Sequence, residues 1–273
     1  MVPLKITMTP EARRYPLSHE VTPELCQKLA RQILDVSGLQ VPLDGVTVAQ
    51  ATVNELPSNH ILRQSFDNFA YFDRQMFTIT TAVDRVAALC EEEEVKEFIE
   101  GCSRITGVSF QAFPYRLFLV HENVHLAHCR KDSSAFQRID TALKDFPNRI
   151  EELVLMLAYT EAVAHFVTGH IASRSHPEGN PLEPLKSFYD HALSGLNYSP
   201  DGLQHLQTMI LRNPQDFRIL GSFYINLGVR WINSLYGMIP DIPKLLQVAI
   251  HHPPESLGEL VYPAEYYRKV SLR

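Results

Sequence analysis

Two histidines and a glutamate within residues 117–129 have the types and spacing that metal chemistry needs. The segment reads LFLVHENVHLAHC, with His121 and His125 four residues apart and Glu122 next to the first. One helical turn separates the two histidines, so both imidazoles project from the same helix face and can bind one metal ion. The carboxylate of Glu122 lies beside that ion, where it can transfer protons. The segment therefore predicts a metal site with an adjacent acid–base group.

The residues around this pattern are apolar, which predicts a buried helix. Charges return only at Arg130, Lys131 and Asp132, where the helix is expected to end. A buried polar side chain requires a partner, because leaving one without a hydrogen bond is costly. A metal ion would satisfy both histidines at once. The alternative is a pair of core histidines that are hydrogen-bonded to carboxylates and carbonyls.

Glu161 is the best candidate for a third ligand. Catalytic zinc usually takes three protein ligands and keeps one position open for water. Glu161 is the only formally charged residue between positions 153 and 171, and it follows His125 by thirty-six residues. That separation leaves room for a loop and a second helix. Without a metal, Glu161 would have to pair with a buried histidine or arginine. His128 lies about 10 Å along the helix from His121, too far to share its ion.

The pattern at 121–125 resembles the active-site helix of the zincin metallopeptidases. Glu161, in the sequence YTEAVAHF, resembles the glutamate that completes the ligand set in the gluzincin subgroup. Many gluzincins have an aspartate or asparagine four residues later, where this chain has His165. The metzincin pattern is excluded, because His128 and Lys131 replace its glycine and third histidine. Cys102 belongs to a weaker resemblance, to the E-G-C-x-S element of peptide deformylases.

The gluzincin resemblance implies a zinc-dependent hydrolase that cleaves peptide bonds. Its metal ligands would be His121, His125 and Glu161, holding one Zn²⁺ per chain, and Glu122 would be the catalytic base. Bound zinc acidifies a water and polarises the scissile carbonyl. The substrate would be a peptide or protein, held along an edge strand within residues 71–81. Five downstream side chains could stabilise the oxyanion, and the sequence selects none of them: Tyr189, His191, Tyr224, Arg230 and Tyr266.

Two other functions fit the same residues. The first is a non-catalytic helical interaction protein, in which the histidines and Glu161 bind a structural metal or form a buried polar network. The second is a metal hydrolase that acts on an acyl group other than a peptide. Glu122 discriminates between the peptidase and the non-catalytic interaction protein, because a structural metal site has no need of a base.

Composition indicates an ordinary globular chain of 273 residues, with 45% hydrophobic and 21% charged residues and a net charge of −6. This modest negative charge does not indicate a basic surface of the kind that binds nucleic acid or a membrane. The most apolar stretch, 153–171, is interrupted by Glu161, His165 and His170, so no membrane span is expected. The four cysteines form no C-x-x-C pair and no signal peptide is visible, which favours the cytoplasm. The oligomeric state is left open.

Hydrophobic periodicity predicts a mostly helical α+β fold in a single domain, 1–273. A small antiparallel sheet is expected in the front part, about 1–110, and a helical body in about 111–273. Strands are predicted at 4–8, 46–53 and 71–81, the last as a strand or a hairpin. The expected helices cover 22–38, the region from 84, and the segments 147–172, 185–196, 201–211 and 217–237. A loop at 176–184 is a candidate boundary or flap, and the proline-rich tail is expected to cover the surface.

Overall fold

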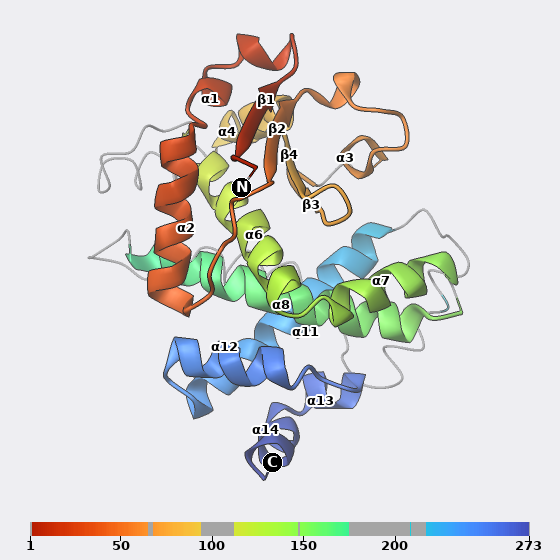
Figure 1. The fold of residues 1–273 in the computed structure, drawn as a ribbon. Helices are drawn as coiled ribbons and strands as arrows, with labels where there is room; N and C mark the ends of the chain where they lie inside the picture. Colours follow the sequence, from red (N-terminus) through yellow and green to blue (C-terminus); the bar gives the residue numbers. More distant parts are fainter. Residues whose placement is uncertain are drawn as a thin grey trace. The chain divides into compact units, whose positions relative to one another are not determined.

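The fold was examined in a computed structural model that describes residues 2–64, 68–93, 112–146, 148–174, 208 and 217–272. The described chain is mostly helical with one small sheet, which confirms the predicted α+β class (Figure 1). It divides into two compact units. Unit 1 contains the chain up to Ala127 and the end of one later helix from His170. Unit 2 contains the residues from His128 to Gly169 and the described residues beyond 181.

The sheet of unit 1 has four strands in the order β1-β2-β4-β3. Their bounds are Lys5–Met8 for β1, Thr47–Ala51 for β2, Ala70–Asp73 for β3 and Thr78–Ala82 for β4. The first two predicted strands are therefore confirmed, and the segment 71–81 forms a hairpin. β3 lies at one edge of the sheet, whereas β4 lies between β2 and β3.

The predicted antiparallel sheet is wrong, because the sheet is mixed. β1 pairs with β2 and β2 pairs with β4 in parallel, and only β3 and β4 are antiparallel. The connection between β1 and β2 contains a 15-residue helix, α2 (Pro23–Ser37), which returns the chain to the same end of the sheet. A crossover of that length permits parallel pairing, whereas the tight turn between β3 and β4 imposes antiparallel pairing.

Helix α2 begins and ends at the residues that the sequence predicts. The side chain of Thr22 accepts a hydrogen bond from the Leu25 amide, and Pro23 occupies the first helical position. Gly38 ends the helix with a φ of 70°, a left-handed conformation that costs glycine little. The apolar face of the helix, with Leu29 and Ile33, is buried.

The β3–β4 hairpin is fixed by its own turn. The carboxylate of Asp73 accepts hydrogen bonds from the backbone amides of Gln75 at 2.9 Å and Met76 at 3.1 Å. Phe77 completes the turn with a φ of 46°, which is uncommon for a residue other than glycine. The hairpin thus holds β3 as a short, defined edge strand.

The remaining elements of unit 1 are short helices and turns, and the other helices lie partly or wholly in unit 2. In unit 1, these are the 3₁₀ turns η1 (Ala12–Arg14) and η2 (Val53–Glu55) and the helices α1 (Pro16–His19), α3 (Ile61–Gln64) and α4 (Val83–Cys90). Two long helices, α6 (Ala112–Lys131) and α8 (Ile150–Arg174), each have residues in both units. Unit 2 adds α7 (Ser134–Lys144), α11 (Phe217–Met238), α12 (Ile242–His251), α13 (Leu257–Val261) and α14 (Pro263–Ser271).

The proline-rich tail is partly buried and partly exposed. Short helices do form there, with Pro243 and Pro263 at first-turn positions that suit a residue without an amide hydrogen. However, Leu245, Leu246 and Ala249 of α12 are fully buried. One face of α12 is therefore buried, whereas Pro243, Lys244 and Gln247 on the other face are exposed.

Three sequence predictions lie outside the described residues: the loop at 176–184 and the helices at 185–196 and 201–211. Among the residues described, no helix is both long and apolar enough to cross a membrane.

Three cysteines of the described chain, Cys26, Cys90 and Cys129, are buried free thiols. Burial raises the pKa of both Cys26 and Cys90 to about 11.

Within unit 2, α11 packs closely against α8 at Gly228. A Cβ atom placed on Gly228 would overlap the carbonyl oxygen of Ala158, and would lie 3.1 Å from the Cβ of Ala162. Both alanines flank Glu161 in the sequence. The small residues at 158, 162 and 228 therefore set how closely the two helices approach, and with it the environment of Glu161.

Replacement of Gly228 by alanine should destabilise unit 2 by about 1–3 kcal/mol, because the added methyl group overlaps backbone that cannot move freely. Gly237→Ala is the matched control in the same helix, since a Cβ there meets nothing within 4 Å. That control should be neutral or stabilise by up to about 1 kcal/mol, because alanine is the better helix former. Urea unfolding followed by the fluorescence of Trp231, the only tryptophan, measures both. Equal stabilities of the two variants would contradict the close packing.

Candidate metal centre

Helix α6 places the side chains of His121 and His125 against each other. Their Nε2 atoms lie 3.1 Å apart and their ring centroids 4.7 Å apart. Two nitrogens bound to one tetrahedral zinc at about 2.0–2.1 Å would lie about 3.3 Å apart. The two rings are therefore spaced as a shared metal ion requires. Without a metal, one Nε2–H can donate a hydrogen bond to the other ring.

Glu122 lies beside this pair on a buried part of α6. The residue is 8% exposed and His125 is 7% exposed. The neighbouring Asn123 is also buried, and its amide donates a hydrogen bond to the Leu119 carbonyl within the same helix at 2.7 Å. The pattern thus lies on the buried helix that the sequence predicts, and its acidic group is shielded from bulk water.

Helix α8 contributes a second pair of ionisable side chains. The Oε2 atom of Glu161 lies 3.5 Å from the Nε2 atom of His165, one helical turn later. Both side chains are largely buried. The carboxylate thus has an imidazole partner on its own helix. A charged side chain in this apolar segment was expected to need such a partner.

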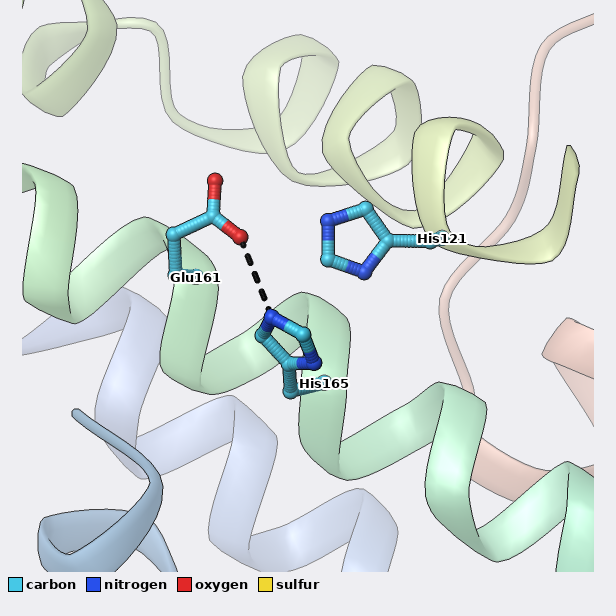
Figure 2. A group of neighbouring side chains, drawn as sticks. All are labelled: His121, Glu161 and His165. Atoms are coloured by element: carbon cyan, nitrogen blue, oxygen red, sulfur yellow. Dashed lines mark ion pairs between the residues drawn. The ribbon is translucent and has the colours of Figure 1, made fainter. Parts of the chain in front are cut away.

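The ligand atoms of His121, Glu161 and His165 all lie within 4.8 Å of one another (Figure 2). The group thus contains two of the three predicted ligands, whereas His125 is not part of it, although its Nε2 atom lies 3.1 Å from that of His121. His165 is the additional donor. Its position four residues after Glu161 places it on the same helix face, a spacing that sequence analysis can detect but cannot distinguish from a supporting role.

The downstream candidates for oxyanion stabilisation fall into separate environments. Burial and then the charge of Glu161 raise the pKa of Tyr224, so this phenol lies near one of the donors and keeps its proton. The hydroxyl of Tyr266 already donates a hydrogen bond to the His252 carbonyl at 2.6 Å. Arg230 is exposed on α11. Tyr189 and His191 lie outside the described residues, as does Cys102 of the alternative resemblance.

His128 belongs to a hydrogen-bonded network inside unit 2. It is fully buried, and its Nε2 atom lies 3.0 Å from the hydroxyl of Tyr159. That hydroxyl donates to the Ala249 carbonyl at 3.2 Å, so it accepts from an Nε2–H of His128. The network links α6, α8 and α12. His128 is therefore a structural residue at some distance along the helix from His121.

The edge strand β3 is attached to α6 within unit 1. The ring of Phe69, just before β3, stacks on that of Phe118 with centroids 4.9 Å apart and planes 13° apart. Phe118 lies three residues before His121. Burial first, then the charges of Asp73 and Glu122, raise the pKa of Tyr71 on β3. The strand therefore lies close to the helix that bears the predicted base.

Comparison of the chain with protein-family models, with characterised proteins and with solved structures found no match.

Replacement of Tyr159 by phenylalanine should destabilise unit 2 by about 1–3 kcal/mol. The ring is retained, but His128 and the Ala249 carbonyl both lose a buried hydrogen-bond partner. Tyr262→Phe is the control, because Tyr262 is more than half exposed. Urea unfolding monitored by Trp231, whose ring contacts that of Tyr159, measures the change. A Tyr159→Phe variant as stable as the control would show that the network contributes nothing.

Proposed function

We propose that this protein is a zinc-dependent hydrolase that cleaves peptide bonds, with His121, His125 and Glu161 as metal ligands and Glu122 as the general base. The observation that carries the proposal is the placement of His121. Its ring nitrogen lies 3.1 Å from that of His125, and its ligand atom lies within 4.8 Å of those of Glu161 and His165. Imidazole and carboxylate donors of this number and kind suit zinc.

The chain's own residues have separate tasks in this reaction. Bound zinc would supply a Lewis acid and acidify a water. Glu122 would accept a proton from the attacking water and pass it to the leaving amine. Glu122 is buried beside the two histidines, which places its carboxylate next to the predicted metal ligands.

His165 has a supporting task in this proposal. Its imidazole lies 3.5 Å from the Glu161 carboxylate and can donate a hydrogen bond that orients it. Partners of this kind fix the direction and basicity of a metal ligand. With His165 in that role, His121, His125 and Glu161 would be the three residues that hold the zinc, which is the usual number in a catalytic site.

The position of β3 at the edge of the described sheet supports a peptide as substrate. The Phe69 carbonyl accepts from the Ala82 amide at 2.9 Å, so residues 69, 71 and 73 direct their backbone groups towards β4. The amides and carbonyls of Ala70 and Phe72 therefore point away from the sheet. An extended peptide can pair with such an edge. The Phe69–Phe118 stack keeps this edge close to α6.

The second candidate is a non-catalytic interaction protein with a structural metal. The observation that favours it is the position of His165 as a fourth potential donor, because four protein ligands close a zinc site to water. If His165 binds the metal together with the other three donors, Glu122 has no reaction to catalyse. We expect the cytoplasm as the setting for either function, consistent with the three buried free thiols of the described chain.

Protein purified without a His-tag should contain about one zinc ion per chain, and His121→Ala, His125→Ala and Glu161→Ala should each lose it. His165→Gln separates the two candidates, because glutamine can still hydrogen-bond to Glu161 but is a poor zinc ligand. In the hydrolase it should retain zinc with affinity weakened by about 10–100-fold. In the closed site it should lose zinc as the alanine variants do. Elemental analysis after dialysis measures the content, and a wild type that takes up no zinc would contradict both candidates.

Replacement of Glu122 by glutamine should retain the zinc and lower the rate of peptide hydrolysis by about 10²–10⁴-fold, because glutamine has the same shape but accepts no proton. Glu151→Gln, on an exposed first turn of α8, is the control and should leave the rate unchanged. A quenched-fluorescence peptide library, assayed with and without a zinc chelator, provides the measurement. Full activity in Glu122→Gln would exclude this mechanism.

A further inference from the structure

The phenol of Tyr71 is a polar group on β3 with no role in the proton transfer proposed for Glu122. Phe69 and Tyr71 are two positions apart in the ladder with β4, so their side chains stand on the same face of the sheet. The Phe69 ring stacks on that of Phe118, which shows that this face is directed at α6. The side chain of Tyr71 therefore also stands on the α6 side of the edge strand.

The spacing along α6 brings the proposed base near this phenol. Phe118 and Glu122 are four residues apart, so they lie on one helix face, about 6 Å from each other along the axis. Phe69 and Tyr71 are separated by about 7 Å along the strand. The two steps start at one ring contact and end at residues that interact, because the charge of Glu122, after burial and the charge of Asp73, raises the pKa of Tyr71. All these residues belong to unit 1.

The ring of Tyr71 is held in place while part of the residue stays accessible. The imidazole of His60 contacts the ring, with centroids 6.2 Å apart and planes at 84°. His60 is itself fixed, because its Nδ1 atom accepts a hydrogen bond from the Leu62 amide at 3.2 Å. Tyr71 nevertheless remains 36% exposed. A positioned phenol on an edge strand can donate a hydrogen bond to a molecule that binds there.

The same strand would hold the substrate. A peptide that pairs with the outward backbone groups of Ala70 and Phe72 lies alongside Tyr71. Strand side chains stand roughly perpendicular to the sheet, so the phenol projects towards α6 and not towards β4. A carbonyl of that peptide that faces α6 is then flanked by the phenol and by Glu122. Donor and base would therefore act on the same peptide bond.

The phenol is a hydrogen-bond donor and not a base. Because its pKa is raised above the ordinary value of 10, Tyr71 remains protonated at neutral pH. A protonated phenol can donate to an oxygen that becomes negative during a reaction. Glu122 becomes neutral when it takes a proton from water, so its charge does not repel that oxygen.

We propose that Tyr71 is a further catalytic residue, whose hydroxyl donates a hydrogen bond to the oxyanion formed from the scissile carbonyl; this inference rests on the proposed function. Attack by water forms a C–O bond and moves the π electron pair of the carbonyl onto its oxygen, while Glu122 takes the proton that the water loses. That pair returns when the C–N bond breaks, and Glu122 gives its proton to the amine. Tyr71 keeps its own proton throughout.

Replacement of Tyr71 by phenylalanine should lower kcat on the best substrate of the peptide library by about 10²-fold, because one donor to the oxyanion is lost. KM and zinc content should stay at wild-type values, since the bound substrate does not yet carry the charge that Tyr71 stabilises. Tyr15→Phe, at a partly buried position of unit 1 outside β3, is the matched control and should leave kcat unchanged.

A phosphinic peptide built on the same substrate provides a measurement that needs no turnover. Its phosphinate oxygen has the charge and position of the oxyanion, so calorimetry should show binding weakened by about 10²-fold in Tyr71→Phe and unchanged in Tyr15→Phe. Wild-type kcat and phosphinate affinity in Tyr71→Phe would overturn this inference and leave the proposed function standing. A raised KM with unchanged kcat would also overturn it, because Tyr71 would then only bind the substrate. A wild type that hydrolyses no peptide would overturn the proposed function, and this inference with it.

Discussion

An ionisable or polar side chain on an apolar helix needs a partner, and this requirement organises both α6 and α8. The charge of Glu161 lies next to His165, the buried His128 is bonded to Tyr159, and His121 faces His125. None of these groups could occupy its helix alone without a large loss of stability. The metal proposal extends the same rule, because one cation would satisfy three or four of these donors together.

Much of the secondary structure could be predicted, because its signals are local. Thr22, Pro23 and Gly38 define α2 without reference to any other segment, and the nearly uninterrupted apolar runs at 117–129 and 153–171 indicate α6 and α8. The topology of the sheet was harder to predict. The relative direction of the strands depends on the connections between them, which the alternation of apolar and polar residues does not encode. The packing partners of α12 could not be predicted for a similar reason: prolines indicate where helices start but carry no information on what the helices pack against.

The candidate site was predictable in its residue types but not in its partners. His121 and Glu161 could be identified because an H-E-x-x-H pattern and an isolated charge are visible in the sequence. The contact of His128 with Tyr159 could not, because thirty-one positions separate them and only packing brings them together. His165 shows the limit most clearly. Its spacing places it beside Glu161, yet the same spacing serves a metal ligand and a hydrogen-bond donor equally well.

The buried thiols offer built-in reporters of local opening. With pKa values of about 11, Cys26 and Cys90 have only about one thiolate per thousand molecules at pH 8, so an alkylating reagent has little to attack in the folded state. Their labelling would follow the transient exposure of unit 1, while Cys129 would follow that of unit 2. In a Cys102→Ser background, the three alkylation rates, resolved by mass spectrometry, would show whether the two units open together or separately.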